Sequence, residues 1–171
     1  MINCSIDISG IFSSIKKKKL SLFLKKIIEK SNEIELLKHV NFSIKIVNKE
    51  GMDKVSKDYI HATPVGMFDT TNMTIYVLYE KDICYMEDTY FHELGHLIDF
   101  VIGKEQGMNG CYSENYNISE VMEADKRFLD YIYADIPKEF FAQSFSECYR
   151  HTNNSVMMFK TKEMFRKLNV A

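Results

Sequence analysis

The stretch FHELGHLID, which runs from Phe91 to Asp99, decides how this chain is interpreted. It contains the pattern H-E-x-x-H within an apolar repeat of helical spacing. His92 and His96 lie one helical turn apart, because a turn takes about 3.6 residues, so both imidazoles project from one face. Two ring nitrogens so placed can bind one zinc ion, and Glu93 can approach a zinc-bound water without becoming a ligand. The stretch therefore predicts a zinc-binding helix with Glu93 as general base.

A catalytic zinc site needs a third protein ligand and one open position. A metzincin would place glycine at position 99 and histidine at position 102, but this chain has Asp99 and Ile102, so that class is excluded. The remaining histidines show no sign of metal binding, and each is expected to be an ordinary histidine: His39, His61 and His151. A carboxylate from a later helix is the alternative.

Glu139 is the best candidate for that carboxylate. It follows Pro137, which suits the first turn of a helix because its missing N–H is not needed there. Phe140, Phe141 and Phe145 would bury one face of this helix while Glu139 points at the metal. Other acids compete for the role: Glu114, Glu120, Glu123 and Glu147.

Length and composition predict a single α+β domain over residues 1–171. The chain has only seven glycines and two prolines, which disfavours an all-β sandwich with its many tight turns. Predicted strands lie before residue 80 and predicted helices mostly after it, so we divide the domain into an N-terminal part, about 1–85, and a helical part, about 86–171.

Local patterns give the individual elements. Apolar spacing predicts helices over 11–30, 32–39, 87–102, 119–131, 137–151 and 155–168. Strands are predicted over 42–46, 65–68 and 74–79, the last two forming a hairpin, while residues 48–58 are left unassigned. Gly103 is expected to end the active-site helix, and residues 103–117 to form a loop.

Charge and apolar runs exclude several classes of function. The net charge of −2 gives no basis for nucleic-acid binding. No apolar run approaches the ~18 residues of a transmembrane helix, and no secretory signal is evident. The four cysteines are scattered and fit a reducing compartment. The sequence says nothing of the oligomeric state.

Two blocks of the chain resemble a known family. FHELGHLID, together with EFFAQSF at 139–145, looks like the catalytic domain of anthrax lethal factor and the related Pro-Pro endopeptidases of clostridia. The similarity covers roughly 60–150 and is specific in these two blocks. It implies a zincin-like fold, with a small twisted, mainly antiparallel sheet, an N-terminal helix and a helical C-terminal half. It also implies a zinc endopeptidase with His92, His96 and Glu139 as ligands of one Zn²⁺ and Glu93 as base.

The chain departs from the family pattern at two positions. The family has an oxyanion-donating tyrosine seven residues before the glutamate, where this chain has Ile132. The flanking tyrosines are Tyr133, which we assign the role, and Tyr131. The family also commonly has a second glutamate where Gln143 stands, and its loss would weaken zinc binding if that acid orients a ligand.

The expected activity is hydrolysis of a peptide bond in a protein or peptide bound in extended form along a sheet edge. Two alternatives stay open: a catalytically inactive binding module, and an intracellular regulatory peptidase that acts on a repressor-type protein. Relatives are often secreted, but without a signal peptide we expect a cytoplasmic protein or one exported by a non-classical route.

Overall fold

The computed structural model describes residues 2–8, 14–57, 63–80, 82–150 and 153–170. The chain divides into two compact units, Met1–Glu93 and Leu94–Ala171, and the boundary falls inside helix α3 (Ile83–Glu105). The first unit combines a sheet with helices, and the described part of the second is helical. The α+β class is confirmed, whereas the single domain stays a prediction.

The sheet of the first unit has four strands: β1 (Asn3–Asp7), β2 (Asn41–Val47), β3 (Gly66–Asp69) and β4 (Thr74–Leu78). Their order is β1-β2-β4-β3, with β1–β2 and β2–β4 parallel and β3–β4 antiparallel. The predicted hairpin is therefore confirmed, but the prediction of a mainly antiparallel sheet is wrong. Helix α1 returns the chain between β1 and β2, which gives the first parallel pair. Strand β4 runs parallel to β2 because β3, which precedes it, runs in the opposite direction.

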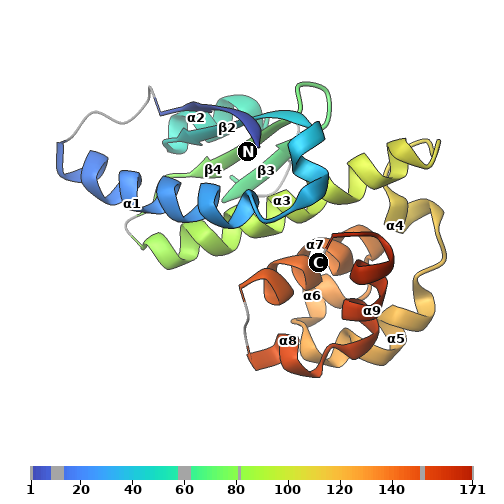
Figure 1. Ribbon diagram of the computed structural model, residues 1–171. Helices are drawn as coiled ribbons and strands as arrows, with labels where there is room; N and C mark the ends of the chain where they lie inside the picture. The colour runs from blue at the N-terminus through green and yellow to red at the C-terminus, as the bar shows by residue number, and fades with distance from the viewer. Residues whose placement is uncertain (1, 9–13, 58–62, 81, 151–152, 171) are drawn as a thin grey trace. The chain divides into compact units, whose positions relative to one another are not determined.

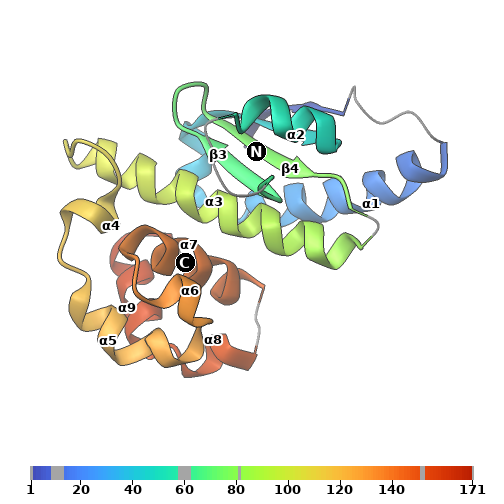
Figure 2. The same ribbon diagram turned by 180° about the vertical axis from the view of Figure 1, so that it is seen from behind.

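Helices cover both faces of this sheet. Helix α1 (Ser14–Ser31) confirms the described part of the helix predicted over 11–30; residues 11–13 lie outside the described residues. The predicted short helix at 32–39 is a 3-10 turn, η1 (Glu35–His39), and the unassigned segment contains α2 (Lys49–Val55). In both views α1 runs beside the first half of α3, while α2 lies across the sheet from them (Figures 1 and 2).

Helix α3 does not end at Gly103 as predicted but continues to Glu105. The stop is Gly107, whose φ of +71° suits a glycine. Its N–H donates to the carbonyl of Lys104 at 3.0 Å, and the N–H of Met108 donates to the carbonyl of Gly103 at 2.8 Å. These two bonds form the Schellman motif that closes many helices.

The second unit contains shorter helices than the sequence predicts. They are α4 (Tyr112–Asn115), α5 (Ser119–Asp125), α6 (Tyr131–Ala134), α7 (Pro137–Tyr149), α8 (Asn153–Met157) and α9 (Phe159–Lys167), with a 3-10 turn, η2 (Lys126–Phe128), after α5. Helix α7 starts at Pro137 as predicted. The predicted loop over 103–117 contains α4, the helix predicted over 119–131 is interrupted by η2, and the one predicted over 155–168 is split at Met158.

Aromatic side chains fill the core of the second unit. Phe140, Phe141 and Phe145 on α7 are fully buried. The ring of Phe141 meets that of Phe165 on α9 edge-on at 5.1 Å, and that of Tyr112 on α4 at 6.4 Å. Helix α7 is therefore held firmly along its apolar face.

The longest helix, α3, has 23 residues, enough to cross a bilayer in length. It carries charged and polar groups along its course, including the buried carboxylates of Glu93 and Asp99. Of the helices in the described residues, none combines the length and the apolar character that crossing a membrane requires.

Candidate metal centre

Helix α3 carries the two predicted histidine ligands on one face. His92 and His96 are both half-buried, while Phe91, Leu94 and Leu97 between and beside them are fully buried. The apolar residues fix how the helix is rotated, because only one rotation buries all of them. The histidines are left at the border of the buried face, where a metal ion can reach them.

Glu139 on α7 joins these histidines. Its Oε2 lies 3.5 Å from Nε2 of His96, and one ligand atom each from His92, His96 and Glu139 all lie within 4.8 Å of one another. The side chain of Glu139 is 26% exposed, so it lies at the border of the core and remains in contact with solvent. The structure therefore brings together the three residues predicted as ligands.

The donor set fits zinc. Two imidazole nitrogens and one carboxylate oxygen are ligands that catalytic zinc sites use, with the fourth position open. Bonds of about 2.0–2.1 Å in a tetrahedron place neighbouring ligand atoms about 3.4 Å apart. The 3.5 Å between His96 and Glu139 already matches that spacing.

The other acids considered as third ligand have other partners. Glu114 pairs with Lys138 at 3.6 Å, and Glu120 pairs with Lys160 at 3.4 Å. Glu123 pairs with Lys126 at 2.9 Å, and Glu147 accepts a hydrogen bond from the amide of Gln143 at 3.1 Å. Of the other histidines, His39 lies on η1, and two fall outside the described residues: His61 and His151.

Glu93, the predicted base, is buried against strand β3. Only 8% of the surface of Glu93 is exposed, and its side chain borders Gly66. A Cβ on Gly66 would lie 2.8 Å from both Cγ and Oε1 of Glu93 and 2.5 Å from a methyl carbon of Thr89. Only a glycine lets the strand approach Glu93 this closely, a contact that sequence reasoning did not foresee.

The predicted oxyanion donor, Tyr133, lies half-buried on α6, which packs against α7. Ile132 beside it is 52% exposed, so the residue at the family position points to solvent. The side chain of the alternative, Tyr131, lies outside the described residues. The role of Tyr133 stays a prediction.

Asp99, one turn after His96, is fully buried and holds the start of α4. Its Oδ1 accepts the N–H of Ser113 at 2.8 Å and its Oδ2 accepts the Ser113 hydroxyl at 2.5 Å. Burial raises the pKa of Asp99 to about 6, against the hydrogen bonds from Ser113, which lower it. In the sequence, Asp99 served only for the comparison of motifs, and this role was not predicted.

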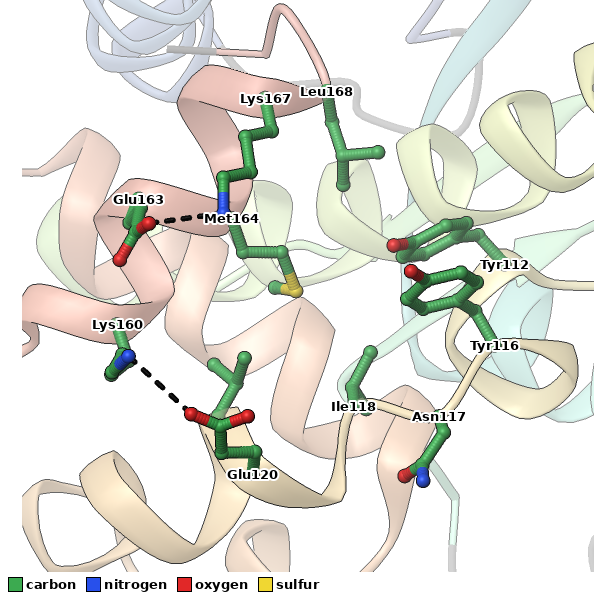
Figure 3. A pocket seen from close by; sticks show the side chains of 11 residues that line it. Tyr112, Tyr116, Asn117, Ile118, Glu120, Lys160, Glu163, Met164, Lys167 and Leu168 are labelled. Atoms are coloured by element: carbon green, nitrogen blue, oxygen red, sulfur yellow. Dashed lines mark hydrogen bonds and ion pairs between the residues drawn. The ribbon is translucent and has the colours of Figure 1, made fainter.

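A separate cavity of about 330 Å³ lies among α4, α5 and α9 (Figure 3). The rings of Tyr112 and Tyr116 stack along one side at 5.0 Å, and the side chain of Met164 extends from α9 into the cavity (Figure 3). Its charged groups form two ion pairs, Lys160–Glu120 and Lys167–Glu163. The cavity shares no lining residue with the candidate metal centre, and these ion pairs balance the charges of its side chains.

No protein-family model matches the chain, and a search of curated proteins finds no match. The resemblance to lethal factor and the Pro-Pro endopeptidases therefore stays a prediction that rests on the two sequence blocks.

Proposed function

We propose that this chain is a zinc-dependent endopeptidase. The observation that supports this most is the grouping of His92, His96 and Glu139, whose ligand atoms lie within 4.8 Å of one another. Glu93 is adjacent to one ligand in the chain and buried, as expected of a base that works without binding the metal. Both helices that carry the ligands are anchored by fully buried aromatic residues.

When bound, zinc acts as a Lewis acid that polarises the scissile carbonyl and lowers the pKa of water. Glu93 takes a proton from the attacking water and later gives it to the leaving amine. Glu93 is buried beside the first ligand, so it can approach a water at the metal without being surrounded by bulk solvent. Tyr133 is the proposed donor to the oxyanion.

The position of strand β3 at the edge of the sheet supports the proposal that the substrate is a peptide. It is an outer strand of the sheet, and among the described residues no strand pairs with its other edge. An extended peptide can add to such an edge through backbone hydrogen bonds. Because Gly66 of β3 lies directly against Glu93, a peptide bound there would pass close to the base.

The proposal is tested by replacing the base without touching the ligands. Parent and Glu93→Gln proteins are loaded with zinc, and their metal content and cleavage of a proteome-derived peptide library are measured. We expect one zinc per chain in both, and a fall in cleavage rate of about 10²–10⁴-fold in the variant. Glu105→Gln, at the exposed end of the same helix, is the matched control and should cleave like the parent.

Two results would reject the proposal. A Glu93→Gln protein as active as the parent would show that Glu93 is not the base. A parent chain that binds no zinc would show that the three residues do not form a zinc site. A parent that binds zinc but cleaves no peptide would favour the second candidate, an inactive binding module. The departures at Ile132 and Gln143 are what favour that candidate.

A further inference from the structure

Helices α3 and α7 meet backbone to backbone at Gly95. A Cβ placed on Gly95 would lie 2.7 Å from Cα and 2.8 Å from the carbonyl oxygen of Ala142. Both residues are fully buried. Backbone atoms of a helix cannot rotate away as a side chain can, so any side chain at this position has to push the two helices apart.

This meeting point lies next to the ligands. Gly95 directly precedes His96, and Ala142 is one turn after Glu139, so this backbone contact lies close to the His96–Glu139 pair. Carbon atoms in contact normally sit about 3.5–4.0 Å apart. A methyl group at Gly95 would thus require a movement of roughly 1 Å, a large change for a carboxylate now 3.5 Å from His96.

We propose that Gly95 is a positioning residue for the metal centre: its missing side chain sets the separation of α3 and α7 at which the Glu139 carboxylate reaches a metal held by the histidines. The inference rests on the metal centre of the proposed function but does not depend on peptide cleavage.

The place of Gly95 within the helix supports this inference. A glycine inside a helix destabilises it by about 1 kcal/mol relative to alanine, so its presence calls for a packing reason. The same helix offers a second glycine for comparison. A Cβ on Gly103 would lie 2.2 Å from the carbonyl oxygen of Gly110 and 2.8 Å from the N of Tyr112, well away from the ligands.

These two glycines give a matched pair of variants. Gly95→Ala and Gly103→Ala each add one methyl group against backbone on the same helix, but only the first lies at the ligands. The zinc dissociation constant of each full-length protein is measured by competition with a chromogenic chelator, and the visible spectrum of the Co²⁺-loaded proteins reports the ligand geometry. Urea unfolding of the metal-free proteins measures the stability lost in each.

We expect Gly95→Ala to weaken zinc binding about 10–100-fold, the loss typical of residues that position a ligand, and to change the Co²⁺ spectrum. Gly103→Ala should lose comparable stability but bind zinc within about threefold of the parent. In a Glu139→Ala background, Gly95→Ala should cause no further loss of affinity, because its effect acts through Glu139.

A Gly95→Ala protein that binds zinc like the parent, or two glycine variants that lose affinity equally, would overturn the inference. If Gly95→Ala does not fold, Glu139→Asp decides, since it shortens the reach of the third ligand without adding volume. It should reproduce the loss of affinity, and unchanged binding would overturn the inference. A parent that binds zinc yet cleaves no peptide rejects the peptidase but leaves this result intact.

Discussion

The two halves of α3 pack in different ways. The first half, Ile83–Glu93, uses large side chains: Tyr90 and Phe91 are fully buried, and the Tyr90 ring meets Phe23 of α1 edge-on at 6.4 Å. The second half, Leu94–Glu105, contains two glycines, Gly95 and Gly103, at which other segments approach with their backbone.

This difference bears on where a metal centre can be built. Packing through large side chains tolerates small changes, because side chains adjust their rotamers. Contact between backbones leaves no such freedom, so the separation of the two segments can change little without disturbing the packing. His96 lies in the second half, beside Gly95, and its partner Glu139 is on the helix that touches Gly95. The backbone contact therefore occurs where two separate helices carry the proposed ligands.

The largest effect on stability should come from truncation in the first half. Phe91→Ala removes a fully buried ring and should lower the free energy of unfolding by about 3–5 kcal/mol. Gly103→Ala instead adds a methyl group in the second half and should lower it by about 1–3 kcal/mol. Urea unfolding followed by circular dichroism measures both.

For Gly103→Ala, the sign of the change in the free energy of unfolding is the informative result. Alanine in place of glycine at an open helical site stabilises a protein by about 0.4–1 kcal/mol. Stabilisation of this kind by Gly103→Ala would show that the backbone contact is not tight, and the contrast between the halves would fail.

The buried carboxyl of Asp99 gives the second half a pH dependence. Burial raises the pKa of Asp99 to about 6 from an ordinary value of 3.8; Glu114 adds to the rise, and Ser113 and His96 oppose it. Between these values the folded chain binds the proton more tightly than the unfolded chain, so this group's contribution to stability falls as pH rises from about 4 to 6. The loss is about 3 kcal/mol and is complete above pH 6.

Asp99→Asn should remove this slope, because the amide does not titrate and its oxygen can still accept the N–H of Ser113. Metal-free parent and variant are unfolded with urea at pH 4 and pH 7, and only the difference between them is used, since other carboxylates titrate too. The free energy of unfolding of the variant, relative to that of the parent, should therefore increase as pH rises from 4 to 7. A difference that stays constant between pH 4 and 7 would contradict the predicted pKa.

The sequence predicted which residues lie together at the candidate site better than it predicted the close packing around them. His92, His96 and Glu93 follow from the helical period, and Glu139 from its place in an apolar helix. The roles of Gly66 and Gly95 did not follow, because close approach of two segments is a property of the packed structure. A glycine inside an otherwise helical motif is the signal in the sequence that could have drawn attention to Gly95.

The fold shows the same limit. Strand β1 (Asn3–Asp7) was not predicted, although Cys4 and Ile6 alternate with polar residues in it, because the segment is short and mostly exposed and so offers little apolar surface. Its pairing with β2 instead includes a bond between the hydroxyls of Ser5 and Ser43 at 2.8 Å. The direction of the strands was also mispredicted, since parallel pairing depends on where helices return the chain and not on the strands' own residues.

The smallest effect tests a polar contact in the first half. The hydroxyls of Ser31 and Tyr90 lie 2.9 Å apart, and both residues are fully buried. Tyr90→Phe keeps the ring but leaves the Ser31 hydroxyl without this partner, which should lower the free energy of unfolding by about 1–2 kcal/mol. Ser31→Ala combined with Tyr90→Phe removes both hydroxyls, so the double variant should lose less than the sum of the single variants. If the losses of unfolding free energy in the two single variants simply add in the double variant, the two hydroxyls do not stabilise each other, and this polar contact contributes nothing to the packing of the first half.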